Sequence, residues 1–259
     1  MPETLLDAVS AVAADVGRMV HGRWQQDFRR WEKLPGHPVC EVDLEADVML
    51  RERLRAIDPE AGWLSEETIN SADRLMRVRA WVVDPIDGTR DYIRGRDGWA
   101  VSIALVEGGS AVLGVLDAPA RGEQWRAQAG QGATRNGAAI AASDRTVLPG
   151  ARVPADGLPK ADSDLVAVHK PNSIALRMAM VAAGQADLLA TLRWGHEWDI
   201  AAAALIAQEA GAIVTDAQGQ PLRFNSTKGE MFGVLATAPA IHAAAVDRLA
   251  GRAAAARVR

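Results

Sequence analysis

Cysteine is nearly absent from this chain of 259 residues, which contains one, Cys40. A single thiol cannot form a disulfide within the chain, so a disulfide-stapled fold is excluded and a reducing compartment is favoured. Apolar runs are also short, and none reaches the roughly 18 residues that a transmembrane helix needs. The first residues lack a basic start followed by a short apolar block, so no signal peptide is predicted. We therefore expect a cytoplasmic protein with no membrane contact.

Charge of one sign is not concentrated in any segment either. The formal net charge is −4, and no block of lysine and arginine provides an electrostatic footprint for nucleic acid. Aromatic residues are few, with one tyrosine and three phenylalanines beside eight tryptophans. We expect these tryptophans to pack the core and the walls of a cleft rather than to form a stacking platform. The chain is long enough for a sizeable core, as one large domain or two modest ones.

The first half of the chain combines helices with strands. Apolar residues recur at helical spacing near the N-terminus, and a second helical pattern begins at Asp43, after a break at residues 35–38. Short apolar runs then predict strands, with Gly108-Gly109 as a hairpin turn between two of them. This pattern favours helices laid on a largely antiparallel sheet. The predicted strands are Trp81–Val83, Val101–Val106, Ala111–Leu116 and Glu123–Gln128.

The second half alternates strands and helices, so the overall class is α/β. It follows a looser segment, Ser143–Asp164, that contains three prolines. We take this segment as the boundary between an N-terminal unit of residues 1–143, with the sheet and most site residues, and a C-terminal unit of residues 144–259. An alanine-rich tail near residues 253–256 is of low complexity. The elements predicted here are strands at 165–168, 188–191 and 212–215 and helices at 173–183 and 201–210.

The most informative motif lies at the end of the predicted strand Trp81–Val83. Its apolar run stops at two carboxylates, Asp84 and Asp87, which Gly88 and Thr89 follow. Pro85 fixes its own φ and biases Asp84 toward extended geometry, which holds the first carboxylate at the strand's end. The next residues predict a turn into a helix N-terminus, where free N–H groups bind anions. Hard oxygen ligands beside such a turn suit magnesium and a phosphate ester. An ordinary Asp-Pro and Asp-Gly turn is the alternative interpretation.

Further acidic residues lie outside this motif. Glu66 and Glu67 follow an apolar stretch, although adjacent carboxylates also occur on solvated faces and at helix N-termini. Asp43 and Asp199 each precede a helical pattern, and both would be plain helix caps in the alternative interpretation. Carboxylates that converge from separate segments can bridge two cations a few ångströms apart. The spacing therefore allows a two-metal site.

These motifs together resemble those of the inositol monophosphatase superfamily, a group of magnesium-dependent, lithium-sensitive phosphomonoesterases. The resemblance spans nearly the whole chain and implies a layered α-β-α-β-α sandwich of the inositol monophosphatase and fructose-1,6-bisphosphatase type. It also implies a homodimer. The blocks that carry it, in the family's order, are Ser65-Glu66-Glu67, Asp84-Pro85-Ile86-Asp87-Gly88-Thr89 and Trp198-Asp199-Ile200-Ala201-Ala202.

The resemblance implies which residues hold the metal ions. Glu66, Asp84 and the backbone carbonyl of Ile86 match the ligands of a first Mg²⁺ ion. Asp84, Asp87 and Asp199 match those of a second, and Glu66 would contact a weaker third ion through water. The block before Asp43 departs from the family's usual Asp-Pro-Val-Thr, because His37 and Cys40 stand at its ends. Whether the site of the weaker third ion is retained therefore stays open. We expect Cys40 to be a buried small residue and His37 a surface residue.

The resemblance also implies the catalytic groups. The nucleophile would be a water activated by the metal ions, and Thr89 with Asp43 matches the pair that orients it. Glu66 would help the metal ions to activate this water, and Glu67 matches a carboxylate that orients neighbouring waters. The backbone N–H groups of Gly88 and Thr89 match the cradle for the phosphate.

The substrate implied is a small phosphate ester. Arg90-Asp91-Tyr92 and Ser65 resemble 3'(2'),5'-bisphosphate nucleotidases, and so do the segments around Arg177 and Glu197, two candidate substrate contacts. The favoured reaction is therefore adenosine 3',5'-bisphosphate to AMP. Ile86 and the Trp99-Ala100-Val101-Ser102 block resemble the inositol branch instead, so inositol-1-phosphate and histidinol phosphate stay open as substrates. Some members of the superfamily act as regulators through protein contacts, and that class stays open too.

Overall fold

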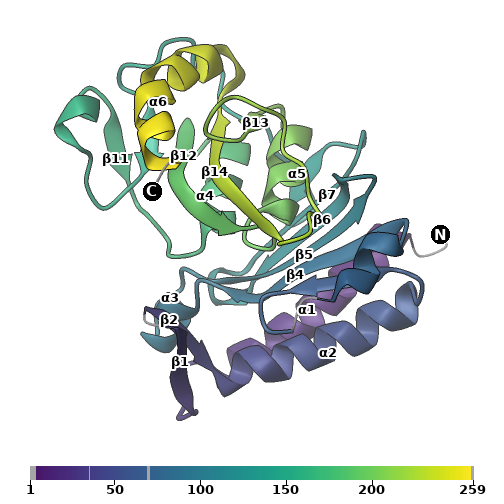
Figure 1. The fold of residues 1–259 in the computed structure, drawn as a ribbon. Coiled ribbons are helices and arrows are strands. Elements are labelled where there is room, and N and C mark those ends of the chain that lie inside the picture. Colours follow the sequence, from purple (N-terminus) through teal and green to yellow (C-terminus); the bar gives the residue numbers. More distant parts are fainter. Residues whose placement is uncertain (1–3, 35, 69–70, 258–259) are drawn as a thin grey trace.

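The structure is a computed structural model that describes residues 4–34, 36–68 and 71–257. Its elements stack in the predicted α-β-α-β-α order, from a helix pair through a large sheet, a second helix pair and a smaller sheet to a final helix (Figure 1). The predicted fold is therefore confirmed. Among the described helices, none is long and apolar enough to cross a bilayer.

The large sheet is mostly antiparallel, as expected. Its strands follow one another in chain order, and β3 and β4 alone among the described pairs in this sheet run parallel. Gly108 and Gly109 form the predicted hairpin turn, with φ of 57° and 81°. The strands are β3 (Gly62–Ser65), β4 (Arg79–Asp87), β5 (Ala100–Glu107), β6 (Ser110–Ala118), β7 (Glu123–Gln128), β8 (Ala133–Arg135) and β9 (Ala138–Ala139).

Both faces of this sheet are covered, which explains its continuous apolar runs. Trp81 and Val83 of β4 pack with α1 (Leu5–Arg23) and α2 (Glu41–Ile57), whereas Val82 packs with helices on the opposite face. Those helices are α4 (Ile174–Ala182) and α5 (Ala201–Glu209).

Helix α5 lies very close to the sheet. A Cβ atom added to Gly114 of β6 would stand 2.6 Å from the carbonyl oxygen of Ala202, so a side chain there would collide with α5. The small residues of this contact bring the start of α5, and with it Asp199, against the large sheet.

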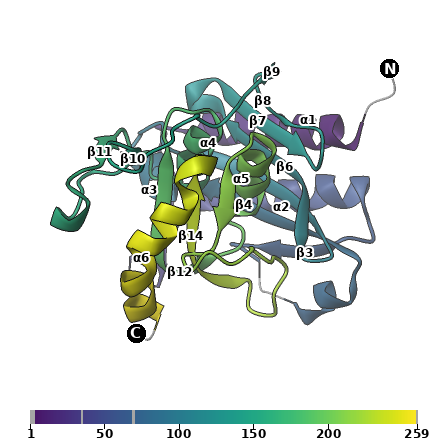
Figure 2. The same cartoon turned by 90° about the horizontal axis from the view of Figure 1, so that it is seen from above.

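The smaller sheet lies between α4 and α5 on one side and α6 (His242–Arg257) on the other (Figure 2). Its strands run antiparallel in the order β12 (Leu188–His196), β14 (Glu230–Thr237) and β13 (Ile213–Thr215). A separate parallel pair, β10 (Arg152–Pro154) and β11 (Val166–Val168), lies in and just after the segment predicted as a boundary.

Beyond short strands that were not predicted, such as β3, β8, β9 and β10, the structure differs from the sequence-based expectations in three places. The predicted break between the first two helices is a β-hairpin of β1 (Arg30–Leu34) and β2 (His37–Cys40). Strand β14 was not predicted, and the alanine-rich tail is the end of helix α6. Pro35 and the side chain of His37 lie outside the described residues, so the prediction for His37 is not tested here.

The remaining described elements are short. Helix α3 (Thr89–Ile93) follows the central motif directly, as expected. One hydrophobic cluster contains Leu64 and Val82 as well as α4, α5 and β14, so residues from both predicted units share a core. The division into residues 1–143 and 144–259 stays a prediction. The 3₁₀ helices are η1 (Ala72–Met76), η2 (Pro119–Arg121), η3 (Lys160–Asp162) and η4 (Pro239–Ile241).

Candidate active site

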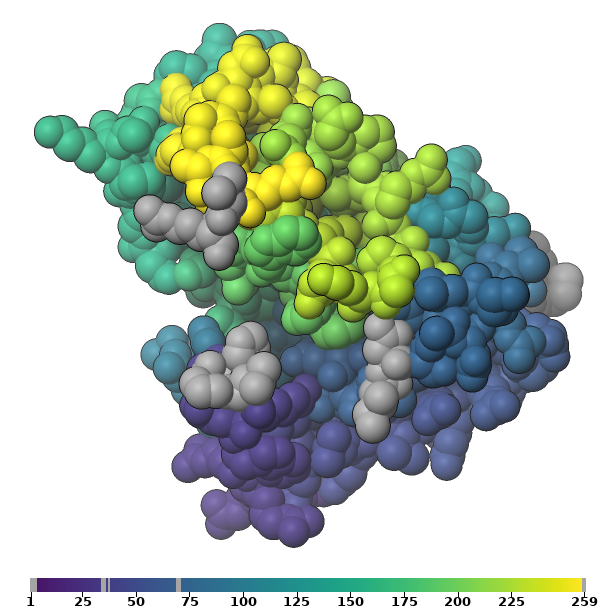
Figure 3. All heavy atoms as spheres, viewed as in Figure 1, coloured from purple at the N-terminus to yellow at the C-terminus, as the bar shows by residue number. Residues whose placement is uncertain are grey.

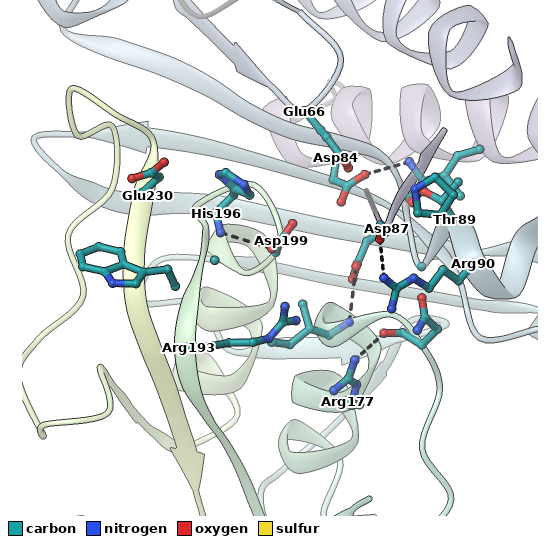
Figure 4. Close-up of a pocket in the computed structure, with 18 residues that line it drawn as sticks. Glu66, Asp84, Asp87, Thr89, Arg90, Arg177, Arg193, His196, Asp199 and Glu230 are labelled. Carbon is teal, nitrogen blue, oxygen red and sulfur yellow. Dashed lines mark hydrogen bonds between the residues drawn. The ribbon is translucent and has the colours of Figure 1, made fainter. Parts of the chain in front are cut away.

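A cavity of about 270 Å³ gathers most of the predicted site residues. The N-terminal and C-terminal parts of the chain meet along the face of the molecule shown in Figure 3. In the close-up, the carboxylates of Asp84, Asp87 and Asp199 point toward one another (Figure 4). The predicted residues that line the cavity are Glu66, Asp84, Ile86, Asp87, Gly88, Thr89, Arg177 and Asp199.

The end of β4 places two of these carboxylates. The register with β5 shifts between Asp84 and Asp87, and the N–H of Ile86 donates to Asp84 Oδ1 at 3.0 Å. Gly88 then turns the chain with φ of 97°, and a Cβ atom there would stand 2.6 Å from the carbonyl oxygen of Gly98. Because only glycine tolerates both conditions, this position makes the tight turn between strand and helix possible.

Asp87 is also held by the start of α4. Its Oδ2 accepts hydrogen bonds from the Ser173 hydroxyl and, at 2.8 Å, from the N–H of Ala175. The N–H of Ile174 lies 3.4 Å from Oδ1. Burial raises the pKa of Asp87 to about 6, although these hydrogen bonds favour its charged form. The C-terminal part of the chain thus orients a carboxylate that the N-terminal part supplies.

Thr89 and Asp43 meet as the resemblance implies. The Thr89 hydroxyl oxygen lies 3.3 Å from Asp43 Oδ1 and 3.0 Å from the carbonyl oxygen of Ile86. Asp43 is the third residue of α2 rather than its cap, and its Oδ2 accepts from the N–H of Cys40 at 2.8 Å. Burial raises the pKa of Asp43 to about 6. The same carboxylate therefore stabilises the helix start and contacts Thr89.

Asp199 does not cap α5 either, because the helix begins at Ala201 with Ile200 as its capping residue. The carboxylate of Asp199 faces the cavity, where Oδ2 accepts from the N–H of His196 at 3.3 Å. Burial raises its pKa well above the ordinary value, and the nearby charge of Asp87 adds to the effect. The interpretation of Asp199 as a plain helix cap is wrong.

Glu197, predicted as a substrate contact, lies outside the cavity. Its side chain is fully buried, and its Oε1 accepts from the N–H of Ser226 at 2.9 Å while Oε2 accepts from the N–H of Asn225. Burial raises the pKa of this carboxyl group. Glu197 therefore holds the loop before β14 and does not reach the cavity as a substrate contact would.

Glu66 and Glu67 share a lysine that the sequence did not predict. Lys33 Nζ, from the β1–β2 hairpin, lies 3.4 Å from Glu66 Oε1 and forms an ion pair with Glu67. Burial, followed by the charge of Glu66, raises the pKa of Glu67 to about 7 despite this lysine. The two glutamates thus differ, because Glu66 lines the cavity whereas the Glu67 side chain is 3% exposed.

The carboxylates around Asp84 lie close enough to repel one another. Burial raises the pKa of Asp84 well above its ordinary value, and Glu66, Asp87 and Asp199 raise it further. As the side chains stand, no three acidic, histidine or cysteine groups in the described part of the chain already surround one point at metal-ligand spacing. The donors are nonetheless all oxygens that face one cavity, which fits Mg²⁺ better than a soft metal. Cys40 is buried, and burial raises the pKa of its thiol, so it stays protonated.

The cavity also contains residues that the sequence analysis did not single out as site residues. Arg90, Arg193, Trp194 and Glu230 line it together with the predicted Arg177. The guanidinium of Arg177 donates to the carbonyl oxygen of Ser173 at 3.2 Å and to that of Asn172. Burial lowers the pKa of Arg177.

Comparisons with known proteins agree with this site. The model of the inositol monophosphatase family matches residues 1–258. A fructose-1,6-bisphosphatase/inositol-1-monophosphatase from Thermotoga maritima is 36% identical over 191 residues, which are 70% of this chain and 72% of the relative. The 3'(2'),5'-bisphosphate nucleotidase CysQ of Escherichia coli is 32% identical over 203 residues, which are 74% of this chain and 81% of the relative.

A solved structure gives the same answer for the fold. The IMPase of Thermotoga maritima superposes with a TM-score of 0.84 at 29% identity, over 97% of this chain and 98% of that one. The family, its fold and its metal-dependent phosphatase chemistry therefore all agree with the cavity of converging carboxylates. The chain belongs to the inositol monophosphatase family and is a phosphomonoester hydrolase.

Proposed function

We propose that this enzyme is a Mg²⁺-dependent 3'(2'),5'-bisphosphate nucleotidase that converts adenosine 3',5'-bisphosphate to AMP. The observation that carries the proposal is the pairing of two kinds of charge in one cavity. Its carboxylates are suited to metal ions at the scissile phosphate, and Arg90, Arg177 and Arg193 line the same space. Guanidinium groups bind phosphate oxygens strongly, and a bisphosphate presents a second phosphate to them. The similarity to a nucleotidase of Escherichia coli supports the same choice.

The metal ligands we propose are those that the motifs imply. Glu66, Asp84 and the Ile86 carbonyl would hold one Mg²⁺ ion, and Asp84, Asp87 and Asp199 a second. A weaker third ion would lie near Glu66. Bound there, the ions would supply the positive charge that a phosphoryl-transfer transition state requires, and they would acidify a water.

The remaining chemistry belongs to the chain's own groups. The Thr89 hydroxyl, which lies between Asp43 and the Ile86 carbonyl oxygen, would orient the attacking water. The backbone N–H groups of Gly88 and Thr89 would bind the scissile phosphate, because both residues line the cavity at the start of α3. Glu67, buried against Lys33, would orient waters beside the site.

The test is phosphate release from a substrate panel in the presence of Mg²⁺. The panel contains adenosine 3',5'-bisphosphate, inositol-1-phosphate, histidinol phosphate and fructose 1,6-bisphosphate. We expect the highest kcat/KM for the nucleotide, with AMP as the organic product. A preference for inositol-1-phosphate would reject the nucleotidase and favour the polyol branch. Binding of a protein partner without turnover of any ester would favour a regulator.

A further inference from the structure

One tryptophan differs from the others in its surroundings. Trp81, Trp99 and Trp125 are at most 1% exposed and pack in the core, as expected. Trp194 is 51% exposed, yet it lines the same cavity as the carboxylates. The expectation that tryptophans pack the core and the walls of a cleft covers the position of Trp194 but not its exposure. An apolar ring half open to water at the edge of a catalytic cavity is a candidate contact for a ligand.

The backbone brings this ring to the cavity by an irregularity in strand β12. Neighbouring residues of a regular strand point to opposite faces, so Arg193 and Trp194 would not share one cavity. The register between β12 and β14 shifts between Thr191 and Trp194, which interrupts this alternation. Both residues line the cavity, and Gly195 next to them adds no side chain that would fill the space.

The Trp194 ring is half exposed, and its aromatic neighbour is not stacked flat on it. Phe232 lies across the sheet from Trp194, with ring centroids 5.7 Å apart and an angle of 66° between the rings. The nearby His196 differs, because it already stacks on Trp198 at 4.3 Å with an angle of 7°. Phe232 thus contacts the indole without a parallel stack, and half of the Trp194 surface stays exposed.

Charge near Trp194 indicates which part of a substrate belongs there. Glu230 pairs with His196 across the two strands that also pair Trp194 with Phe232. Both Glu230 and Trp194 line the cavity, and Figure 4 labels Glu230 and His196 at its edge. A carboxylate at this point repels a second phosphate and accepts hydrogen bonds from an amino group. The phosphates are therefore expected nearer Arg177 and Arg193, and a neutral flat ring nearer Trp194.

We propose that Trp194 is the specificity-determining residue of this enzyme, on which the base of a nucleotide substrate stacks. The inference rests on the proposed nucleotidase function and adds the residue that recognises the base of the nucleotide leaving group, AMP. Base–aromatic stacking tolerates different bases, because every base has a π face. Trp194 thus selects nucleotides over polyol phosphates without distinguishing adenine from other bases.

The decisive experiment compares two substrates in three variants. The substrates are adenosine 3',5'-bisphosphate and the corresponding sugar bisphosphate without a base. In Trp194→Ala, KM for the nucleotide should rise about tenfold or more while kcat changes little, as expected when stacking is lost. The KM for the baseless substrate should stay the same. Trp194→Phe should restore most of the nucleotide affinity, and Trp194→Leu should not.

The matched control is Trp31→Ala, which removes an indole that is 43% exposed on strand β1 and does not line the cavity. It should leave both KM values unchanged. A second readout is calorimetric binding of AMP, which should weaken about tenfold in Trp194→Ala and recover in Trp194→Phe.

The outcomes separate this inference from the proposed function. If the wild-type enzyme hydrolyses the nucleotide but Trp194→Ala affects both substrates equally, or neither, Trp194 is not the stacking residue. If the wild-type enzyme does not hydrolyse adenosine 3',5'-bisphosphate, the proposed nucleotidase is rejected. In that case AMP binding decides the role of Trp194, and absence of binding overturns it as well.

Discussion

The Thr89 hydroxyl oxygen lies 3.3 Å from Asp43 Oδ1, although 46 residues separate the two in the sequence. The contact joins the first residue of α3 to the first turn of α2, and both residues are among those implied by the family resemblance. Two explanations of why each residue is present can therefore be tested. Each can serve catalysis, or each can simply stabilise the start of a helix.

Thr89→Ala is expected to lower kcat and kcat/KM together, by about 10²–10⁴-fold, with little change in KM. The substitution keeps the backbone N–H and removes only the hydroxyl that would align the water. Asp43→Asn should act similarly, and the double variant should be far from additive because the two groups work as a pair. Steady-state kinetics of the three variants checks this.

The competing explanation predicts a different result for the same variants. Asp43 also accepts a hydrogen bond from the N–H of Cys40, and a helix cap contributes about 1 kcal/mol to stability. If capping were the whole role, Asp43→Asn would lower the melting temperature and leave turnover nearly normal. Thermal unfolding measured beside kinetics therefore separates the two roles.

Asp84→Asn is expected to abolish Mg²⁺-dependent turnover, because in the proposed site the Asp84 carboxylate is a ligand of both ions. Burial and neighbouring carboxylates raise the pKa of Asp84, so removing its charge relieves repulsion in the metal-free protein. The metal-free variant should therefore melt at or above the wild-type temperature. Mg²⁺ should raise the melting temperature of the wild type and much less that of the variant. Normal activity of Asp84→Asn at saturating Mg²⁺ would contradict the two-ion site.

Lithium and calcium are both expected to inhibit the enzyme. Lithium carries too little charge to replace a Mg²⁺ ion, and calcium accepts longer bonds and looser geometry than magnesium. Inhibition curves at several Mg²⁺ concentrations measure the competition. Undiminished activity after exhaustive chelation would show that no divalent ion takes part.

Asp47→Asn is expected to weaken Mg²⁺ binding without touching the cavity. The Asp47 carboxylate accepts hydrogen bonds from the hydroxyls of Ser65 and Thr68, on either side of Glu66 and Glu67. An amide cannot accept both on the same terms, so the glutamate loop should loosen. Calorimetric titration with Mg²⁺ checks this, and Ser65→Ala should cause a smaller loss in the same direction. Equal Mg²⁺ affinity in wild type and Asp47→Asn would show that the loop is held by other contacts.

Much of the cavity lining could be predicted because its residues lie in short motifs. Asp84, Asp87, Gly88 and Thr89 are local neighbours, and a proline and a glycine constrain the backbone between them. Lys33 could not be found in this way, since it meets Glu66 and Glu67 from a hairpin that resembles a plain break in the sequence.

Arg193, Trp194 and Glu230 could not be predicted as cavity residues for another reason, which is the irregular geometry of strands β12 and β14. A register shift in β12 decides that both Arg193 and Trp194 face the cavity, and an alternating pattern cannot reveal such a shift. Strand β14, which carries Glu230, includes Gly233 at φ of 66°, a residue that weakens a strand pattern. Periodicity indicated the α/β class and most elements, and the family resemblance implied their layered order. The cavity-lining residues Arg193, Trp194 and Glu230 depended on irregularities that neither of these reveals.

A last prediction concerns pH and an ion pair outside the cavity, in which the carboxylate of Asp187 is buried and the Arg152 side chain is 39% exposed. Asp187 is 1% exposed and accepts hydrogen bonds from Arg152 Nε at 3.0 Å and from the Ser143 hydroxyl at 2.7 Å. Burial opposes its ionisation, but these hydrogen bonds outweigh burial and lower the pKa of Asp187 from 3.8 to about 2. The ionised carboxylate joins the segment around Arg152 to the start of β12.

The sign of the effect follows from the direction of that shift. Because the pKa is lower in the folded state, Asp187 stabilises the fold above its unfolded pKa of 3.8 and loses this contribution as pH falls to about 2. The contribution at pH 7 is about 2 kcal/mol. Urea unfolding should therefore show a deficit of this size for Asp187→Asn at pH 7 that shrinks toward pH 2.

Asp7→Asn provides the matched control, because the pKa of Asp7 is also lowered to about 2, through hydrogen bonds from Thr4 and Arg126 on an exposed helix end. Salt screens exposed charges more than buried ones. Added salt should therefore reduce the effect of Asp7→Asn and leave that of Asp187→Asn nearly intact. If salt reduced both effects equally, or if the deficit of Asp187→Asn did not depend on pH, the Asp187–Arg152 pair would not be the stabilising contact inferred from its burial.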